Sequence, residues 1–156
     1  MSAYDVSVQR LESIPLAVIR RQVRAPELAR VVPELCGVVW NAMRAQQTPA
    51  GRHVAVYWDA SIRLDVGVEV RGPFVDAGDV VHSATPAGPV ATTTHFGPYG
   101  GLHAAHEAVR QWCAAQQHRF AGPSWEIYGH WMPDWDAHPG QIRTDVFYLL
   151  SDEGAK

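Results

Sequence analysis

The stretches Trp40–Gln47 (WNAMRAQQ) and Trp112–Gln117 (WCAAQQ) end two segments of helical periodicity in the same way. Each tryptophan is followed by the tyrosine of a predicted strand, Tyr57 after 17 residues in one case and Tyr128 after 16 in the other. We interpret this spacing as an internal duplication in which the order strand, strand, helix, strand, strand occurs twice. The first repeat covers about residues 4–72 and the second about residues 79–150.

Periodicity places the elements within each repeat. Apolar residues at steps of three and four predict a helix over 27–44. Pro33 leaves an alternative, in which the proline marks the first turn of a shorter helix and 26–32 form a separate turn. Strict alternation makes 62–70 the clearest strand. The turn 97–101 (GPYGG) leads from a strand to the second helix, because its glycines tolerate positive φ. The remaining strands are expected at 4–8, 16–23, 53–58, 80–81, 90–96, 125–131 and 142–150.

These elements predict an α+β fold made of two similar halves. Antiparallel sheets are expected to carry the helices on one face, and the other face is free to line a central groove between the halves. A chain of 156 residues with 47% hydrophobic residues can bury a substantial core. We therefore expect residues 1–156 to form a single domain.

Composition argues against several classes of function. A net charge of −3 gives no positive field for nucleic acid, so we expect no direct binding to it. The chain has no apolar run of the roughly 18 residues of a membrane span and no apparent leader, which predicts a cytoplasmic protein without a membrane partner. Cys36 and Cys113 are too far apart for a thiolate zinc site, and His103 with His106 is a weak metal motif. No phosphate-binding loop is present, so neither a metal nor another cofactor is expected.

The octapeptide 124–131 (SWEIYGHW) carries the strongest chemical signal. Strand alternation puts Glu126, Tyr128 and His130 on one face and Trp125 on the other. If the first face lines a cleft, the partly desolvated carboxylate favours a cationic ligand, and each flanking ring adds about 0.5–2 kcal/mol by stacking on it. Alternatively, Glu126 faces solvent as part of the polar side of an amphipathic strand.

Four motifs in order resemble the GyrI-like small-molecule-binding domain, which also forms the effector-binding part of multidrug-responsive transcription regulators. They are 95–99 (HFGPY), a helix ending near Trp112, 125–128 (WEIY) and 143–147 (RTDVF). The resemblance covers about Val6 to Leu150 and implies two pseudo-symmetric β-α-β-β repeats with a central ligand cleft. It also implies that Glu126 lies at the floor of this cleft. The sequence departs from the regulators in lacking a helix-turn-helix before its first strand, and it has Phe147 where many relatives carry tyrosine.

The leading hypothesis is a domain that binds lipophilic, planar aromatic and often cationic small molecules. Glu126 supplies the counter-charge, and the ring-bearing residues are Tyr57, Trp40, Tyr128, Phe147 and Trp112. The resemblance also extends to hydrolases that open the cyclopropane ring of DNA-alkylating natural products. In that alternative Glu126 is catalytic and activates a water, while Tyr128 or Tyr57 orients the substrate.

A third hypothesis is a protein-interaction module, because the family's name-giving member inhibits gyrase. Asp134, Asp136 and Asp152 lie in the acidic second half and could mimic phosphate. We consider this less favourable, because a net charge of −3 is a weak field.

Overall fold

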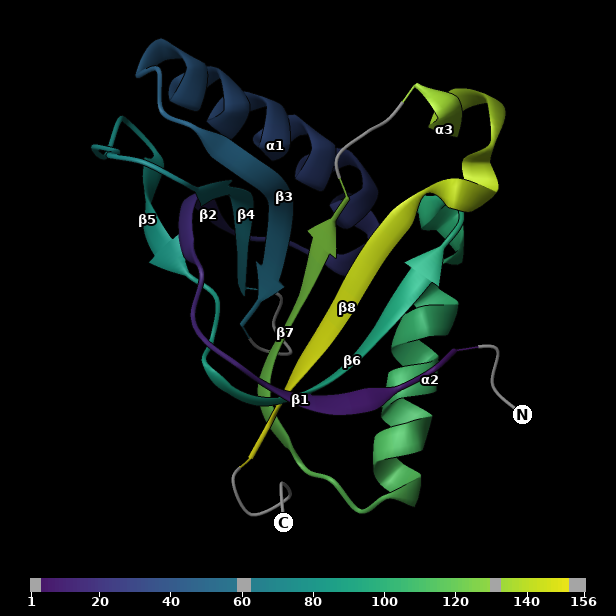
Figure 1. Ribbon diagram of the computed structural model, residues 1–156. Helices are drawn as coiled ribbons and strands as arrows, with labels where there is room; N and C mark the ends of the chain where they lie inside the picture. Colours follow the sequence, from purple (N-terminus) through teal and green to yellow (C-terminus); the bar gives the residue numbers. More distant parts are fainter. Residues whose placement is uncertain (1–3, 59–62, 130–132, 152–156) are drawn as a thin grey trace. The chain divides into compact units, whose positions relative to one another are not determined.

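The computed structural model describes residues 4–58, 63–129 and 133–151 (Figure 1). Contacts divide the chain into two compact units. The N-terminal unit is residues 13–86, and the C-terminal unit combines residues 1–12 with residues 87–156. The order strand, strand, helix, strand, strand occurs twice along the chain, which confirms the predicted α+β fold.

The N-terminal unit is a four-stranded antiparallel sheet with one long helix. Its strands lie in the order β3-β4-β2-β5. Helix α1 packs against β4, β2 and β3 and buries Leu35, Val39 and Met43. The elements are β2 (Pro15–Gln22), η1 (Ala25–Glu27), α1 (Leu28–Ala45), β3 (Ala50–Tyr57), β4 (Arg63–Val70) and β5 (Val80–Ala84).

The C-terminal unit has the same plan, with strands in the order β1-β6-β8-β7. Helix α2 packs against β6 and β8, as Figure 1 shows. The elements are β1 (Ser7–Leu11), β6 (Gly88–Phe96), η2 (Tyr99–Gly101), α2 (Leu102–Ala115), β7 (Phe120–Tyr128), α3 (Asp134–Ala137), η3 (Pro139–Gln141) and β8 (Arg143–Leu150).

The two repeats exchange their first strands. Strand β1 precedes the first helix in sequence but pairs with β6, with Ser7 opposite Thr92. Strand β5 precedes the second helix but pairs with β2, with Val80 opposite Ile19. Each unit therefore contains one strand from the other repeat. Alternation in a sequence records which face a strand buries and not which strand it pairs with, so the pattern could not reveal this exchange.

Both helices end at a glutamine in the left-handed conformation, Gln47 with φ 55° and Gln117 with φ 62°. In each case the following residue returns a backbone N–H to the helix, which closes the C-terminus. The similar helix exits in the sequence are therefore structurally equivalent. When the two helices are aligned on these glutamines, Trp40 corresponds to Arg110, so Trp112 is not the counterpart of Trp40.

Helix α1 begins at Leu28, close to the predicted start at residue 27, so the alternative in which Pro33 marks the first turn is wrong. Proline inside a helix lacks one backbone hydrogen bond and crowds the preceding turn. Here the buried side chains of Val31 and Leu35 flank the proline on the apolar stripe of the helix. The free energy gained by burying this stripe outweighs the cost of the proline.

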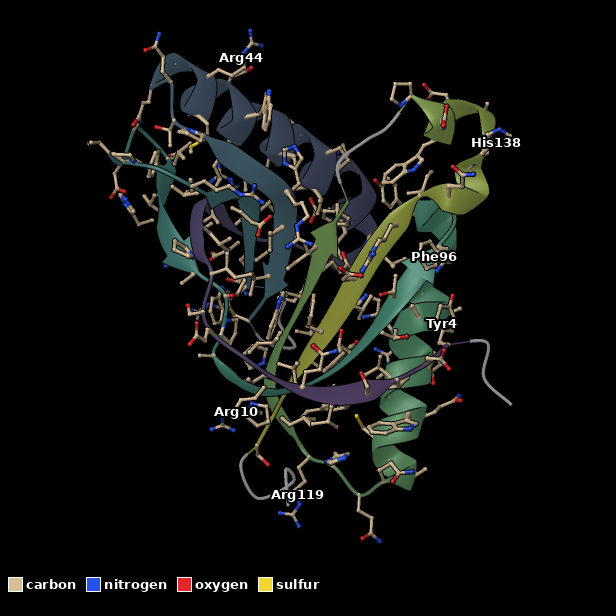
Figure 2. The ribbon with its side chains drawn as sticks, viewed as in Figure 1. Tyr4, Arg10, Arg44, Phe96, Arg119 and His138 are labelled. Atoms are coloured by element: carbon tan, nitrogen blue, oxygen red, sulfur yellow. The ribbon has the colours of Figure 1, made fainter. Side chains whose placement is uncertain are left out.

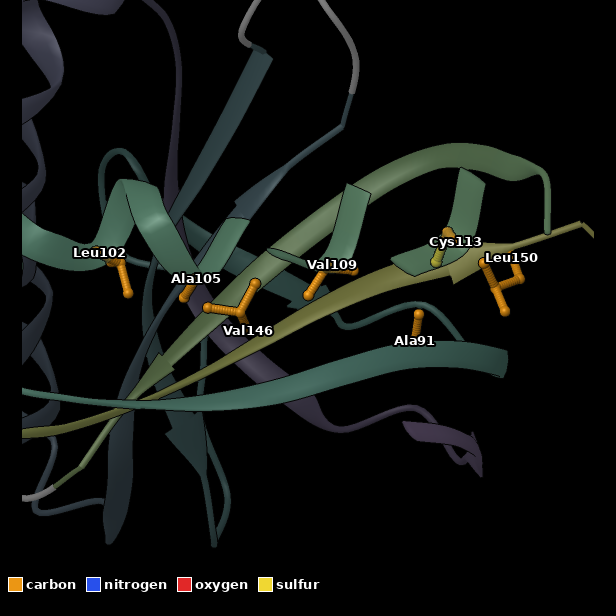
Figure 3. Packing of buried hydrophobic residues seen from close by; sticks show 7 residues of the cluster. All are labelled: Ala91, Leu102, Ala105, Val109, Cys113, Val146 and Leu150. Atoms are coloured by element: carbon orange, nitrogen blue, oxygen red, sulfur yellow. The ribbon is translucent and has the colours of Figure 1, made fainter. Parts of the chain in front are cut away.

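A cluster of buried side chains joins α2 to the sheet of the C-terminal unit (Figure 3). It consists of Ala91, Leu102, Ala105, Val109, Cys113, Val146 and Leu150. Because Val146 belongs to this cluster, the side of the sheet on which Val146 lies is the side covered by α2. The pairing partner of Val146 on β7 is Glu126, which therefore lies on the same side.

Candidate functional site

Glu126 is a buried carboxylate between the sheet and α2. Only 5% of it is exposed, so it is not a solvated residue of an amphipathic strand. Tyr128 lies on the same face, as alternation predicts, whereas His130 and Trp131 fall outside the described residues. The structure places Glu126 under the helix and not on the open face of the sheet, where the sequence analysis expected it.

Two side chains make short hydrogen bonds to the carboxylate. The Tyr128 hydroxyl donates to Oε1 of Glu126 at 2.5 Å. Nε2 of His106, on α2, lies 2.5 Å from Oε2. Hydrogen bonds to an ionised acceptor are shorter and about twice as strong as neutral ones. A strand and a helix therefore hold the carboxylate from two directions.

The other ring nitrogen of His106 continues the chain of hydrogen bonds. Its Nδ1 lies 2.7 Å from the hydroxyl of Tyr148 on β8, and Nη1 of Arg110 donates to the same hydroxyl at 3.0 Å. An ionised carboxylate can only accept, so Nε2 of a neutral His106 carries the proton and donates it to Glu126. Nδ1 then accepts from the Tyr148 hydroxyl, whose oxygen in turn accepts from Arg110.

The Tyr148 hydroxyl remains a donor at neutral pH. Burial raises the pKa of this phenol and outweighs the nearby Arg110, which lowers it, while Glu126 raises it further. At its outer end Arg110 forms an ion pair with Glu107, at 3.0 Å, on the exposed surface of α2. The chain of polar groups thus runs from solvent to the buried carboxylate.

Aromatic rings flank the hydrogen-bonded cluster at two points. Tyr99 meets Tyr128 edge to face with ring centroids 5.7 Å apart, and Phe120 lies 5.0 Å from the ring of Tyr148. Tyr99 is 45% exposed and Phe120 is 40% exposed. Each exposed ring therefore contacts a tyrosine of the cluster around Glu126.

The motif 95–99 holds Tyr99 in place. His95 is buried, and its Nε2 donates to the backbone oxygen of Pro98 at 3.0 Å. Its Nδ1 then accepts from the hydroxyl of Tyr4 at 2.9 Å (Tyr4 is labelled in Figure 2). Gly97 has φ +134°, a conformation that L side chains rarely adopt. The histidine and the glycine together fix the turn that presents Tyr99 to Tyr128.

The family model of the GyrI-like small molecule binding domain matches residues 4–149. The chain belongs to this family. Similar solved structures include the C-terminal domain of EcmrR, with 17% identity and a TM-score of 0.75 over 96% of this chain and 98% of that one. No curated protein matches the chain.

Two further solved structures share the GyrI-like fold. SAV2435 bound to tetraphenylphosphonium has 12% identity and a TM-score of 0.70, over 96% of this chain and 95% of that one. A hydrolase from Listeria innocua has 13% identity and a TM-score of 0.60, over 97% and 94%. At such identities the likeness shows the fold alone. None of the helices described in this GyrI-like domain is long and apolar enough to cross a membrane.

Phe147 is not part of the cluster around Glu126. It pairs with Trp125 across β7 and β8, and the two rings stack with centroids 5.4 Å apart. Adjacent strand residues point to opposite faces, so both rings lie on the side of the sheet away from Val146. The structure therefore does not bring Phe147 to the carboxylate.

Trp112 lies near the C-terminal end of α2. It packs against the apolar cluster of the C-terminal unit and stacks on His118, with centroids 5.5 Å apart. Six residues separate it from His106, which is about 9 Å along a helix. Trp112 thus borders the same core at some distance from Glu126.

Tyr57 and Trp40 belong to the N-terminal unit. Tyr57 is the last residue of β3, as Tyr128 is the last residue of β7. The pairing of β3 with β4 is regular from His53 to Tyr57, so Tyr57 lies on the same face of the sheet as Ala55. Trp40, on α1, contacts the ring of His53 at 5.6 Å, which identifies that face as the one beside the helix. A role of either residue in ligand binding stays a prediction.

Sequence reasoning missed His106, Tyr148 and Arg110. His106 entered the analysis only as half of a weak metal motif with His103. Its two ring nitrogens are instead bonded to Glu126 and Tyr148. Within the described residues, no group of three or more His, Cys, Asp or Glu side chains is placed to hold a metal ion. Alternation with Val146 could have put Tyr148 on the face of Glu126.

The remaining candidate groups have ordinary surroundings. Burial raises the pKa of Cys36 to about 12 and also raises that of Cys113, so neither thiol is a nucleophilic thiolate near neutral pH. Asp134 and Asp136 are exposed on α3, and Asp152 lies outside the described residues. The phosphate-mimic hypothesis therefore stays untested.

Proposed function

We propose that this GyrI-like domain binds lipophilic, planar aromatic compounds that carry positive charge, with Glu126 as the counter-charge. The observation that carries the proposal is a carboxylate that is 5% exposed and hydrogen-bonded by Tyr128 and His106. The rings of Tyr99 and Tyr148 contact these two residues. Sequestration of such compounds in the cytoplasm is the role that we favour.

The physical basis is the cost of a buried charge. Desolvating a carboxylate costs several kcal/mol unless hydrogen bonds and opposite charge compensate for it. The hydroxyl of Tyr128 and the imidazole of His106 supply hydrogen bonds. A cation brought close to Glu126 adds Coulomb attraction in a medium of low polarity. The rings of Tyr99 and Phe120 offer faces for stacking, each worth about 0.5–2 kcal/mol to a cation.

The chemistry of one neighbour agrees with this proposal. SAV2435 is a protein of the same fold whose structure contains tetraphenylphosphonium, a lipophilic cation with aromatic rings. This supports a cation as the probe for the present chain.

The test is a fluorescence titration of ethidium or rhodamine 6G against wild type and Glu126→Gln. Loss of one buried charge contact of about 1.4–2.8 kcal/mol weakens binding about 10- to 100-fold. Glu34→Gln is the matched control, because it removes a carboxylate from the exposed surface of α1, outside the chain of hydrogen bonds, and leaves Glu126 in place. Equal affinities of wild type and Glu126→Gln would remove the electrostatic account.

The contact between Glu126 and His106 favours one alternative, the hydrolysis of a conjugated cyclopropane. Glu126 takes a proton from water, the water oxygen bonds to a ring carbon, and the strained C–C bond breaks. Its electron pair enters the conjugated system, which takes up the proton, so that one water is added in total. Tyr128 orients the substrate in this scheme.

Mass spectrometry separates catalysis from binding. The protein is incubated with a cyclopropane-bearing alkylating compound at equal concentration, and the product is analysed for an added water. Hydrated product from wild type and none from Glu126→Gln supports the enzyme. Unchanged compound with wild type counts against it and leaves the binding proposal intact.

A further inference from the structure

The chain of hydrogen bonds to Glu126 has a single sense. Arg110 donates to Tyr148, Tyr148 donates to Nδ1 of His106, and Nε2 of His106 donates to Glu126. This order holds while the imidazole is neutral, because the ionised carboxylate can only accept from Nε2, which leaves Nδ1 to accept from Tyr148. All four groups lie in the C-terminal unit, on α2, β7 and β8.

His106 is the member of this chain whose charge can change. Histidine is the side chain that ordinarily titrates between about pH 5 and 8. When neutral, His106 donates one N–H to a carboxylate that keeps its charge. When protonated, it donates from both ring nitrogens, so that Nδ1 donates to the Tyr148 oxygen. A full positive charge then lies 2.5 Å from Oε2 of Glu126 and satisfies that carboxylate from within the protein.

Other charged and titratable groups face the imidazole or its neighbours. Strand β7 contributes Glu126 and Tyr128, and β8 contributes Tyr148. On α2, the exposed ion pair of Arg110 and Glu107 lies at the outer end of the chain. Arg110 lowers the pKa of Glu107, and His103 adds a smaller electrostatic effect in the same direction. From β6, His95 is held by Tyr4 and Pro98 in a separate set of hydrogen bonds.

We infer that His106 is a positioning residue that sets the charge of the Glu126 site, so that a proton on its imidazole and a cationic ligand on Glu126 compete. This inference rests on the proposed function and adds its regulation. Tyr148 and Arg110 hold the imidazole in the tautomer that donates to the carboxylate.

Competition predicts a definite pH dependence. Only the fraction of protein with neutral His106 offers Glu126 to a cation, so the apparent dissociation constant rises as that fraction falls. The affinity is then expected to decrease as the pH is lowered. A neutral aromatic ligand has no such competition, and its affinity stays nearly constant.

The first arm of the experiment needs no ligand. Nitrogen-15 NMR of the histidine side chains reports which ring nitrogen of His106 carries the proton at high pH. We expect the Nε2–H tautomer in wild type and a mixture of tautomers in Tyr148→Phe, which lacks the donor to Nδ1. The Nδ1–H tautomer in wild type would overturn the inference.

The second arm measures ethidium affinity between about pH 5 and 8. Wild type should weaken toward low pH. His106→Gln should bind about as well as wild type at the upper end and show a flat profile, because an amide N–H still donates to Glu126 but does not titrate. Identical pH profiles in the two proteins would overturn the inference about His106 but not the proposed function. Absence of ethidium binding at every pH would instead overturn the proposed function.

Discussion

The two units of this protein have the same order and pairing of strands but different chemistry at corresponding positions. In the C-terminal unit Glu126 pairs with Val146, and in the N-terminal unit Ala55 pairs with Val66. When the helices are aligned on their terminal glutamines, Cys36 is the residue that corresponds to His106. When the strands are aligned by their register, Val68 is the residue that corresponds to Tyr148.

One unit therefore closes its helix–sheet contact with apolar side chains, and the other places a carboxylate and its donors there. The tyrosine is kept in both, as Tyr57 and Tyr128. Since the same backbone plan tolerates either filling, the fold does not require the polar cluster. Its cost in buried charge motivates the function that we propose for it.

Two buried carboxylates of the N-terminal unit, Asp65 and Glu69, sharpen the contrast, because they lie on the other face of its sheet and in ion pairs. Asp65 is fully buried and accepts from Arg20 at 2.7 Å and from Ser83 at 2.7 Å. Glu69 accepts from Arg52 at 2.9 Å. These groups stabilise the unit, whereas Glu126 is held by an imidazole and a phenol.

The largest effect is expected from Ala55→Glu, which copies the carboxylate into the apolar unit. Ala55 is fully buried. The residues of this unit that correspond to His106 and Tyr148 are Cys36 and Val68, which offer the carboxylate no comparable hydrogen bonds. A buried charge left uncompensated costs about 3–5 kcal/mol of stability. Urea denaturation should show this loss, and Ala55→Val is the control for added volume. If Ala55→Glu were as stable as wild type, the contrast between the units would be contradicted.

A smaller loss of stability is expected from Asp65→Asn. Hydrogen bonds to a charged group contribute about 1.5–3 kcal/mol, and the amide replaces the carboxylate that Arg20 requires. Ethidium affinity should stay unchanged, because Glu126 is not altered. Denaturation and titration of the same sample test both halves of this expectation, and a matching loss of affinity would argue against separate roles for the two carboxylates.

Asp65 also predicts how stability depends on pH. Burial alone would raise the pKa of its carboxyl, but hydrogen bonds from Arg20 and Ser83 outweigh burial and lower it. A folded pKa below the unfolded one stabilises the protein above the unfolded pKa of about 3.9, and this contribution is lost as the pH falls through the folded value. Acid titration of wild type should show this loss below about pH 4, and Asp65→Asn should not.

Tyr128→Phe removes one donor from Glu126 and leaves the ring in place. Loss of a hydrogen bond to a buried acceptor costs about 1–3 kcal/mol. We expect a lower urea midpoint with the contact between Tyr99 and residue 128 retained. If the midpoint stays at the wild-type value, the short hydrogen bond in this structure contributes little to holding the carboxylate.

The smallest effect is expected from Tyr99→Ala. The ring is exposed, so stability should change little, but an aromatic contact of about 0.5–1.5 kcal/mol is removed. Ethidium affinity should fall about two- to tenfold. Phe96→Ala, an exposed ring in the same motif, is the control (Figure 2), and an equal effect of both changes would remove any special role for Tyr99.

The sequence predicted the order of elements because helical periodicity, strand alternation and the two helix exits are local signals. Alternation also placed Glu126 and Tyr128 on one face. The exchange of β1 and β5 could not be predicted, because strand pairing joins residues as distant as Ser7 and Thr92. His106 was missed for the same reason, since its contact with β7 depends on how α2 lies on the sheet.

The central claim is that Glu126 acts as a buried negative charge. The most direct measurement compares the binding of tetraphenylphosphonium and tetraphenylborate, which have nearly the same shape and opposite charge, to wild type and Glu126→Gln. The account predicts that wild type prefers the cation and that the glutamine variant loses this preference while remaining folded. The same preference for the cation in both proteins would contradict it.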